Sequence, residues 1–248
     1  MRVSALWRHP IKSHGREALD RLTLIEGQTV PWDRHWAVTH EASKYDGTAW
    51  APCANFMIGT RFPSLAGIDA TLDVATRTLT LTHRDRPALT FSPDTAEGAA
   101  AFLDWVAPLI PEGGRKPVAL REAPDVGLTD TPFPSVSLMS TASHRAVEGR
   151  LGRALEPERW RGNIWFEGAA PWEEFEWIGR EITVGTARLR IEDRIERCKH
   201  TMANPVTGQR DTDTLGLLQE GWGHTDFGIY GVVTQGGDVA LQDELRLS

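Results

Sequence analysis

Residues 182–201 read ITVGTARLRIEDRIERCKHT, and this stretch carries both a strong fold signal and a strong chemical signal. Its first part alternates apolar and polar residues on either side of Gly185, which predicts a β-hairpin. Its last eight residues place four basic side chains around Cys198, one of only two cysteines. Nearby cations favour the thiolate, which acts as nucleophile or metal ligand. A free cysteine is more often a small buried apolar residue, and this segment alone favours that interpretation.

The same alternation recurs along the chain and predicts a mainly β fold. A clear hairpin is expected over 67–83, where two alternating runs flank a short turn. Further strands are expected at 2–8, 19–25, 34–40, 135–139, 161–168 and 238–247. Because glycine and proline turns separate these short strands, we predict a β-barrel or β-sandwich with a few helices.

Three helices are expected between the strands. The first begins with Ser92 as its capping residue and Pro93 at its first position, and it runs to about Ala107, before Pro108. The second follows Ser140 or Ser143 and ends at Gly152, which suits the left-handed conformation at a helix end. A third, short helix is expected over 211–219.

A domain boundary is expected near residue 125, inside a stretch rich in glycine and proline. The chain then divides into two β-rich parts, residues 1–125 and 126–248, each long enough to bury a core. Two placements of residues 1–34 remain open. They belong to the first part, or they pack with the second part so that their basic residues reach the same ligand as Cys198.

The composition is that of an ordinary globular protein. Of its 248 residues 40% are hydrophobic and 25% charged, and a net charge of -7 argues against nucleic acid as a partner. No run approaches the ~20 apolar residues of a membrane helix, and the start, MRVSALWRHPIKS, lacks the apolar core of a signal peptide. We therefore expect a cytoplasmic protein with reduced thiols and no membrane contact.

Several common cofactor motifs are missing from the sequence. It has no dinucleotide-binding or phosphate-binding glycine loop, no paired cysteines or histidines with zinc spacing, and no serine-hydrolase elbow. Two cysteines are too few for a conventional iron–sulfur cluster. What remains is one cysteine in a basic segment, together with polar loops such as Lys12-Ser13 that suit an anion. The residues alone predict an anion-binding β protein with a functional cysteine.

Seven short motifs then narrow the interpretation. They are HPIKS at 9–13, WDR at 32–34, RGNIWFEG at 161–168, PWEEFEWIG at 171–179, ERCKHT at 196–201, NPVTGQRD at 204–211 and DFGIY at 226–230. In this order they resemble the motifs of MOSC-domain proteins that carry a MOSC N-terminal β-barrel region. The resemblance covers nearly the whole chain, and within the family it is similar to the mitochondrial amidoxime-reducing component and its bacterial relatives.

The resemblance implies that the chain binds molybdenum cofactor, a pterin dithiolene that carries a phosphate. Cys198 would be the molybdenum ligand and the catalytic residue. The other implied cofactor-binding residues are Lys12, Ser13, Arg34, Ser135, Arg161, Asn163, Arg197 and Tyr230. Ser135 comes from the loop 130–140, which matches a cofactor-contacting loop of the family. Other roles remain open for three of these residues: Asn163 as a turn residue, Tyr230 as a core aromatic, and Arg34 as half of a surface ion pair.

The implied activity is reduction of N-hydroxylated or N-oxide small molecules by a molybdenum-cofactor-dependent oxidoreductase. Electrons would come from a separate flavoprotein reductase or ferredoxin, because the chain has no other recognisable redox centre. One alternative is a cofactor or sulfur carrier that uses Cys198 without redox turnover. A second alternative is a cysteine hydrolase that pairs Cys198 with His200. The sequence does not decide the oligomeric state, and a monomer is our expectation.

Two features depart from the family pattern. Where close relatives carry Thr-Ala-Arg, this chain has Thr48-Ala49-Trp50, so one cation on the substrate or cofactor side is in doubt. Cys53 follows shortly afterwards, and we expect it to be an inert buried thiol. Some bacterial relatives carry a ferredoxin domain at the C-terminus, and we expect none here.

Overall fold

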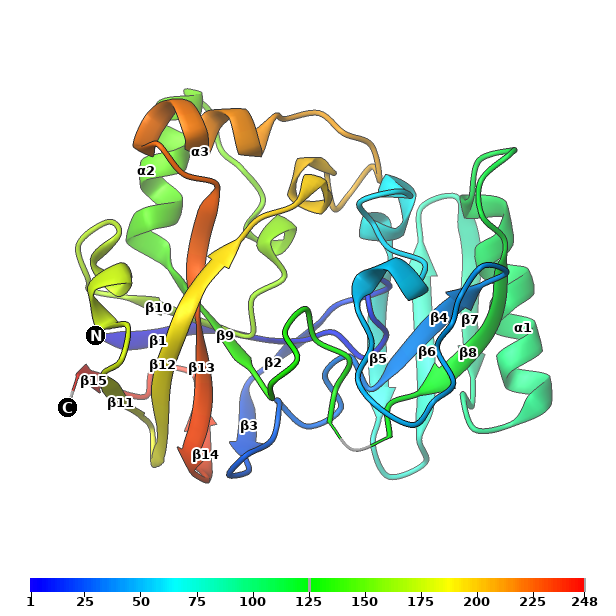
Figure 1. The fold of residues 1–248 in the computed structure, drawn as a ribbon, viewed down its shortest axis with the longest axis horizontal. Coiled ribbons are helices and arrows are strands. Elements are labelled where there is room, and N and C mark those ends of the chain that lie inside the picture. The colour runs from blue at the N-terminus through cyan, green and yellow to red at the C-terminus, as the bar shows by residue number, and fades with distance from the viewer. Residues whose placement is uncertain (125, 248) are drawn as a thin grey trace.

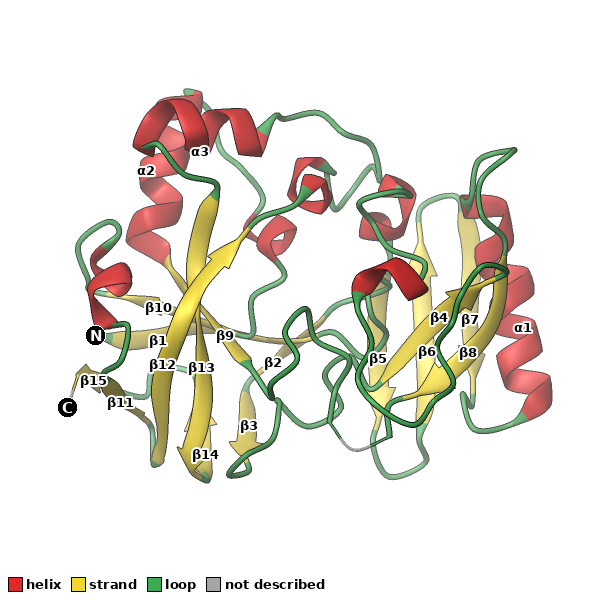
Figure 2. Ribbon diagram, viewed as in Figure 1, coloured by secondary structure: helices red, strands yellow, loops and turns green. Residues whose placement is uncertain are grey.

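The computed structural model describes residues 1–124 and 126–247. This described part contains fifteen strands and three α-helices, so the predicted mainly β fold class is confirmed (Figure 2). The elements form two bodies that lie side by side (Figure 1). We call the body that contains both termini the larger body, and the other, which contains α1, the smaller body.

The larger body is built on a curled sheet of eight strands. In spatial order they are β15 (Leu245–Leu247), β11 (Glu181–Val184), β12 (Ala187–Glu196), β13 (Asp226–Gln235), β9 (Val136–Ser140), β10 (Ile164–Glu167), β1 (Arg2–Arg8) and β2 (Glu17–Leu19). Neighbours run antiparallel, except that β9 and β10 are parallel. The register between β12 and β13 shifts three times, and such irregularities help to bend a sheet.

The predicted hairpin around Gly185 is present, and it forms the second and third strands of this sheet. Strands β11 and β12 pair across a turn at Gly185, whose φ of 58° lies in the left-handed region. Leu189 and Ile191 are fully buried, whereas the arginines that alternate with them are exposed. The alternation that predicted the strand therefore places one of its faces in the core.

The first residues of the chain belong to this larger body. Strand β1 pairs with β10, and β3 (Arg21–Leu24) pairs with β14 (Gly237–Ala240). The loop 9–16 contacts the smaller body, and after β3 the chain crosses into that body. The predicted boundary near residue 125 falls on a residue outside those that the structure describes, so the division into residues 1–125 and 126–248 stays a prediction.

The smaller body consists of two small sheets and one helix. Strand β4 (Trp36–His40) pairs with β8 (Pro117–Glu122), while β5 (Asp69–Asp73), β6 (Thr78–His83) and β7 (Arg86–Phe91) form a second sheet. The predicted hairpin over 67–83 is β5 and β6. Helix α1 (Ala96–Val106) buries Phe102 and Trp105 in the core of this body.

Helix α1 begins later than predicted. The capping side chain is Thr95, whose hydroxyl accepts a hydrogen bond from the Gly98 N–H at 3.0 Å. Ser92 instead takes part through its carbonyl, which accepts the hydroxyl proton of Thr95. Both residues precede a polar stretch that can start a helix, and the sequence does not distinguish them. The prediction of Ser92 as the cap is therefore wrong.

The second predicted helix matches the structure closely, whereas the third lies three residues later than the predicted 211–219. Helix α2 (Thr141–Leu151) is capped by Ser140 and ends at Gly152 in the left-handed conformation. Helix α3 (Thr214–Trp222) is capped by Asp213. None of the described helices has the length and apolar character needed to cross a membrane.

Two predicted strands are each divided in the structure. The run 19–25 contains the end of β2 and all of β3, which belong to different sheets. The run 238–247 contains most of β14 and all of β15, separated by a turn. Within each divided run the chain passes from one sheet to another. The turn between the two strands hardly disturbs the alternation of apolar and polar side chains, so the sequence does not show it.

One carboxyl group is fully buried in the larger body. Glu174 lies in a short 3-10 helix, Glu173–Trp177, and accepts a hydrogen bond from the Ser143 hydroxyl at 2.7 Å. The same hydroxyl oxygen accepts the backbone N–H of Trp172 at 2.8 Å. Because burial disfavours the charged form, the pKa of Glu174 rises from 4.5 to about 7.

This shift predicts a pH-dependent stability. Between pH 4.5 and 7 the folded chain keeps a proton that the unfolded chain has lost, so the free energy of unfolding falls as pH rises, by up to about 1.4 kcal/mol per pH unit. We expect Glu174→Gln to gain roughly 2–3 kcal/mol relative to the wild type between pH 5 and pH 8. Urea titrations at both pH values measure this difference. Equal pH dependence of the two proteins would contradict it.

Candidate functional site

One large cavity lies where the two bodies meet. Its volume is about 370 Å³, and its walls come from both bodies and from the segments that cross between them. Seven of the nine predicted cofactor-binding residues line it: Lys12, Ser13, Arg34, Arg161, Arg197, Cys198 and Tyr230. The structure thus brings residues from distant parts of the sequence to one place. Whether they bind a cofactor stays a prediction.

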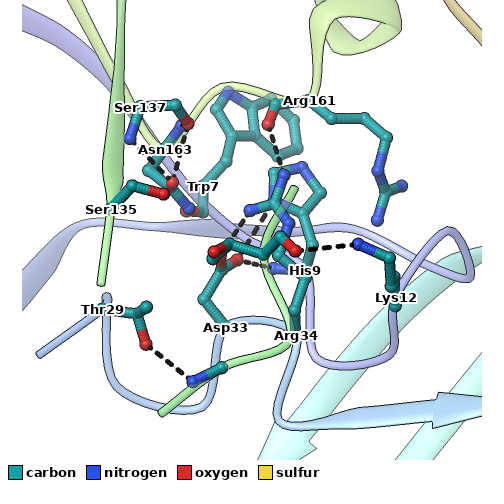
Figure 3. A network of polar contacts seen from close by, with 12 residues as sticks. Trp7, His9, Lys12, Thr29, Asp33, Arg34, Ser135, Ser137, Arg161 and Asn163 are labelled. Atoms are coloured by element: carbon teal, nitrogen blue, oxygen red, sulfur yellow. Dashed lines mark hydrogen bonds and ion pairs between the residues drawn. The ribbon is translucent and has the colours of Figure 1, made fainter. Parts of the chain in front are cut away.

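The other two predicted residues, Ser135 and Asn163, line a smaller neighbouring hollow. The side chain of Asn163 is buried and fully engaged. Its Oδ1 accepts the hydroxyl proton of Ser137 at 2.7 Å, and its Nδ2 donates to the carbonyl of Trp7 at 3.2 Å (Figure 3). Asn163 therefore joins β1 and β9 from within the sheet, and this geometry assigns it a structural part whatever ligand the cavity holds.

Three residues of the cavity wall have an uncommon backbone conformation. Ser13, Arg34 and Arg161 have φ values of 63°, 48° and 49°, in the left-handed region that residues with a β-carbon rarely adopt. Each such residue costs on the order of 1–3 kcal/mol and persists only where surrounding contacts fix it. Strained residues of this kind cluster at functional sites, and here all three line one cavity.

A buried carboxylate fixes a segment that crosses between the two bodies. Asp33 is 1% exposed and accepts hydrogen bonds from the backbone N–H of His9 at 2.7 Å and from the guanidinium of Arg34 (Figure 3). Burial alone would raise the pKa of Asp33, but the charge of Arg34 and the hydrogen bond with His9 hold it well below its usual value. Arg34 also donates to the carbonyl of Arg161 at 3.0 Å, and this hydrogen bond joins the segment that contains Arg34 to the larger body.

Lys12 is buried, and all three N–H donors of its ammonium group are in use. It donates to the carbonyls of Leu128 and Thr129 at 2.8 and 3.2 Å, and to Oδ1 of Asp130 at 2.6 Å. An ammonium group has no fourth donor. The charge of Lys12 contributes to the field in the cavity, but a direct hydrogen bond to a ligand requires one of these contacts to break.

Arg161 differs from Lys12 because part of its guanidinium is unused. Its Nη1 donates to the carbonyl of Gly15 at 3.1 Å, whereas its Nη2 is buried and has no hydrogen-bond partner among the described residues. Burial and the nearby charge of Arg34 lower the pKa of Arg161 to about 9, so it remains a cation at neutral pH. A buried, unpartnered donor on a cation costs free energy unless an acceptor binds it, and this marks a place for an anion.

Arg197 is fixed by the protein itself. It donates to the carbonyls of Phe227 and Trp160 at 2.7 and 2.9 Å, and it lies over the rings of the same two residues. Burial lowers its pKa to about 10, which leaves it charged at neutral pH. Tyr230 stands on β13, and burial raises its pKa to about 12, so it is a neutral hydroxyl in the cavity wall.

Cys198 presents an exposed thiol to this cationic cavity. It follows the end of β12 and precedes a short 3-10 helix, Lys199–Met202. The hydroxyl of Thr60, from the smaller body, donates to its sulfur at 3.1 Å. The buried-cysteine interpretation, which the segment alone favoured, is therefore wrong for Cys198, and the motifs that resemble the family gave the better signal.

The histidine two residues further on is a poor partner for this thiol. His200 lines the same cavity, but burial and the charges of Arg161 and Arg34 lower its pKa to about 3. A base this weak takes up little of a thiol proton at neutral pH. The geometry and charge around His200 therefore do not favour the hydrolase alternative.

Two further cavity residues had no clear sequence signal. Cys53 is half-buried, lines the cavity, and donates its S–H to Oδ1 of Asp130 at 3.2 Å. The expectation that Cys53 is simply buried is therefore wrong. Asp130 lay at the start of a loop expected to contact the cofactor, but nothing in the sequence indicated its pairing with Lys12 or Cys53.

The contact between His200 and the smaller body requires a glycine. A β-carbon added to Gly59 would lie 2.0 Å from Nδ1 of His200. We expect Gly59→Ala to lower the free energy of unfolding by about 1–3 kcal/mol, because either body must shift to relieve the overlap. In the control Gly149→Ala, in helix α2, the added carbon meets nothing within 4 Å, and the gain should be about 0.5–1 kcal/mol. Denaturant unfolding of both variants measures the two effects, and equal stability would contradict the prediction.

Comparisons with known proteins place the whole chain. It matches the MOSC domain over residues 129–246 and the MOSC N-terminal beta barrel domain over residues 1–106. No curated protein matches it. The structure of YuaD from Bacillus subtilis is 14% identical, with 98% of this chain and 93% of that chain covered, at a TM-score of 0.47.

The structure of YiiM from Geobacillus stearothermophilus is 18% identical, with 46% of this chain and 53% of that chain covered, at a TM-score of 0.35. At these TM-scores neither likeness carries an argument about this chain. The two family matches, which together span most of the sequence, do. This chain belongs to the MOSC domain family, some of whose members bind molybdenum cofactor, and its MOSC domain follows a MOSC N-terminal β-barrel domain.

Proposed function

We propose that this chain binds molybdenum cofactor in the large cavity and reduces N-hydroxylated or N-oxide compounds with it. The observation that carries the proposal is the exposed thiol of Cys198 in the same cavity wall as the buried, unpartnered guanidinium nitrogen of Arg161. When bound, the cofactor supplies a two-electron redox change. The protein supplies a soft ligand, fixed cations and an enclosed place for a small substrate.

The residues present fit a cofactor that brings most of its own metal ligands. Among the described residues, no group of three or more histidine, cysteine or acidic side chains could hold a metal ion. The cavity offers two thiols at most, too few to hold a metal alone, which suits a metal already held by a dithiolene. The unpartnered Nη2 of Arg161 suits a phosphate, because a hydrogen bond from a guanidinium to a phosphate oxygen is charge-assisted and therefore strong.

Each residue has a definite part in this proposal. Cys198 ligates the metal, and the hydroxyl of Thr60 orients its sulfur. Arg161 and Ser13 contact the phosphate end, while Arg34 holds the carbonyl of Arg161 and so fixes the position of its side chain. Tyr230 stays protonated and can donate to a ligand in the cavity.

The proposal includes partners outside the chain. Because the sequence has no recognisable nicotinamide, flavin or iron–sulfur motif, we propose that a separate flavoprotein reductase or ferredoxin delivers the electrons. The substrate is a small N-hydroxylated or N-oxide molecule. We also propose a cytoplasmic monomer that binds neither nucleic acid nor membranes.

Metal analysis is the first test. We expect protein purified from a host that makes molybdenum cofactor to contain nearly stoichiometric molybdenum and pterin. Cys198→Ser should lower the molybdenum content at least tenfold, because a hydroxyl is a poor substitute for a soft thiolate. The matched control Cys53→Ser, which changes the other cavity thiol, should retain it. The loaded wild type should also convert an aryl amidoxime to the amidine with an artificial electron donor.

Other outcomes point elsewhere. Pterin that does not depend on Cys198 would favour a carrier, and a mass increase of about 32 Da on Cys198, one sulfur atom, would identify a sulfur carrier. Neither metal nor pterin from a competent host would contradict cofactor binding. A loaded protein inactive with artificial donors and with plausible redox partners would contradict the proposed reduction.

A second prediction concerns Arg161. Arg161→Met removes a charged donor that the protein leaves unpartnered, so retention of pterin should fall roughly tenfold or more, because a charge-assisted hydrogen bond contributes about 1.5–3 kcal/mol. The cofactor-free protein loses only the hydrogen bond to Gly15, worth about 1 kcal/mol. Arg180→Met, at an exposed position outside the cavity, is the control. Unchanged pterin retention in Arg161→Met would remove the phosphate role.

A further inference from the structure

The cavity contains both cysteines of the chain, and their surroundings are opposite in charge. Cys198 is exposed, adjoins Arg197 in the sequence, and accepts a hydrogen bond from Thr60. Cys53 is half-buried and acts as a donor, with its S–H directed to a carboxylate oxygen of Asp130 at 3.2 Å. Both cysteines line the same cavity, so a soft metal or an electrophile that enters has two thiols as possible targets.

A chain of two contacts fixes the carboxylate next to Cys53. Oδ1 of Asp130 accepts from Nζ of Lys12 at 2.6 Å and from Sγ of Cys53 at 3.2 Å. The ammonium group is buried, and it also holds the carbonyls of Leu128 and Thr129. The position of Asp130 is thus set by its loop and by Lys12, and its pKa is held far below the usual value, mainly by the charge of Lys12.

A fixed carboxylate next to a thiol opposes ionisation of that thiol. The thiolate would lie against a negative charge, and the hydrogen bond that the S–H donates would be lost. Burial is the largest cause of the raised pKa of Cys53, which reaches about 11, and the charge of Asp130 adds to it. Because the thiolate and not the thiol ligates metals and attacks electrophiles, Cys53 is chemically silent at neutral pH.

We propose that Asp130 is a specificity-determining residue that keeps Cys53 a neutral thiol, and thereby leaves Cys198 as the one cavity cysteine whose sulfur has a hydroxyl rather than a carboxylate as its hydrogen-bond partner. Asp130 acts through Cys53 and is a positioning residue. The consequence for metal ligation rests on the proposed function, whereas the difference between the two thiols does not.

The test uses the cofactor-free protein and iodoacetamide, with alkylation of each cysteine followed by mass spectrometry from about pH 6 to pH 11. In the wild type we expect Cys53 to react at least tenfold more slowly than Cys198 at neutral pH. Asp130→Asn leaves the Lys12 ammonium unpaired next to Cys53. It should raise the Cys53 rate at least tenfold at neutral pH and lower the midpoint of its pH profile by one unit or more.

Lys12→Met separates the charge effect from loosening of the loop. Both substitutions break the Lys12–Asp130 contact, but only Asp130→Asn removes the carboxylate. The proposal expects Lys12→Met to leave Cys53 unreactive, because the carboxylate that disfavours its thiolate is still present. If both variants raise the Cys53 rate equally, simple exposure explains the effect and the proposal is overturned.

Two further measurements cover a variant that folds poorly. Asp130→Glu retains the carboxylate and should keep Cys53 slow, and circular dichroism checks the fold of each variant. The wild-type profile alone also decides: a Cys53 midpoint below about pH 9, near that of an ordinary thiol, would overturn the proposal. Because this protein carries no cofactor, a failure of the proposed function, seen as missing molybdenum, leaves these results unchanged.

Discussion

The buried ion pair of Asp33 and Arg34 is the contact on which the arrangement of the cavity depends. Asp33 holds the turn at His9, and Arg34 reaches the carbonyl of Arg161 in the larger body. One carboxylate thus fixes two segments that cross between the bodies, one at His9 and one at Arg34, relative to the sheet. A buried charge is tolerated only when it is paired and hydrogen-bonded. Loss of either partner would leave the other charge buried and unpaired where the two bodies join.

This arrangement gathers positive charge at one place and neutralises only part of it. Lys12 is satisfied by Asp130 and two carbonyls, and Arg197 by two carbonyls and two aromatic rings. Arg161 keeps an unused donor. Together with three left-handed residues in the cavity wall, this unused donor makes the site locally unfavourable. An anion that binds there removes part of that cost, and this relief contributes to the free energy of binding.

Much of the fold was predictable because a strand with one buried face shows alternating apolar and polar residues in the sequence. The hairpin at Gly185 was found in this way, whereas the cap at Ser140 was one of two serine candidates. Strands β7 and β8 were missed because most of their residues are partly exposed and alternate weakly. The candidate site came from motifs that resemble a family, since no spacing rule joins Lys12 to Cys198. The pairing of Cys53 with Asp130 joins residues far apart in the sequence, so local patterns could not show it.

The early strand β1 has consequences for the order in which the chain folds. It pairs with β10, whose partner residues extend to Glu167, so one edge of β1 stays open until most of the chain has been made. The smaller body, by contrast, contains all of its strands between Trp36 and Glu122 and can form first. During synthesis the nascent chain must therefore keep its first hairpin available while another body folds behind it. The cavity is completed late, and a ligand that meets the unfinished chain finds only half of its contacts.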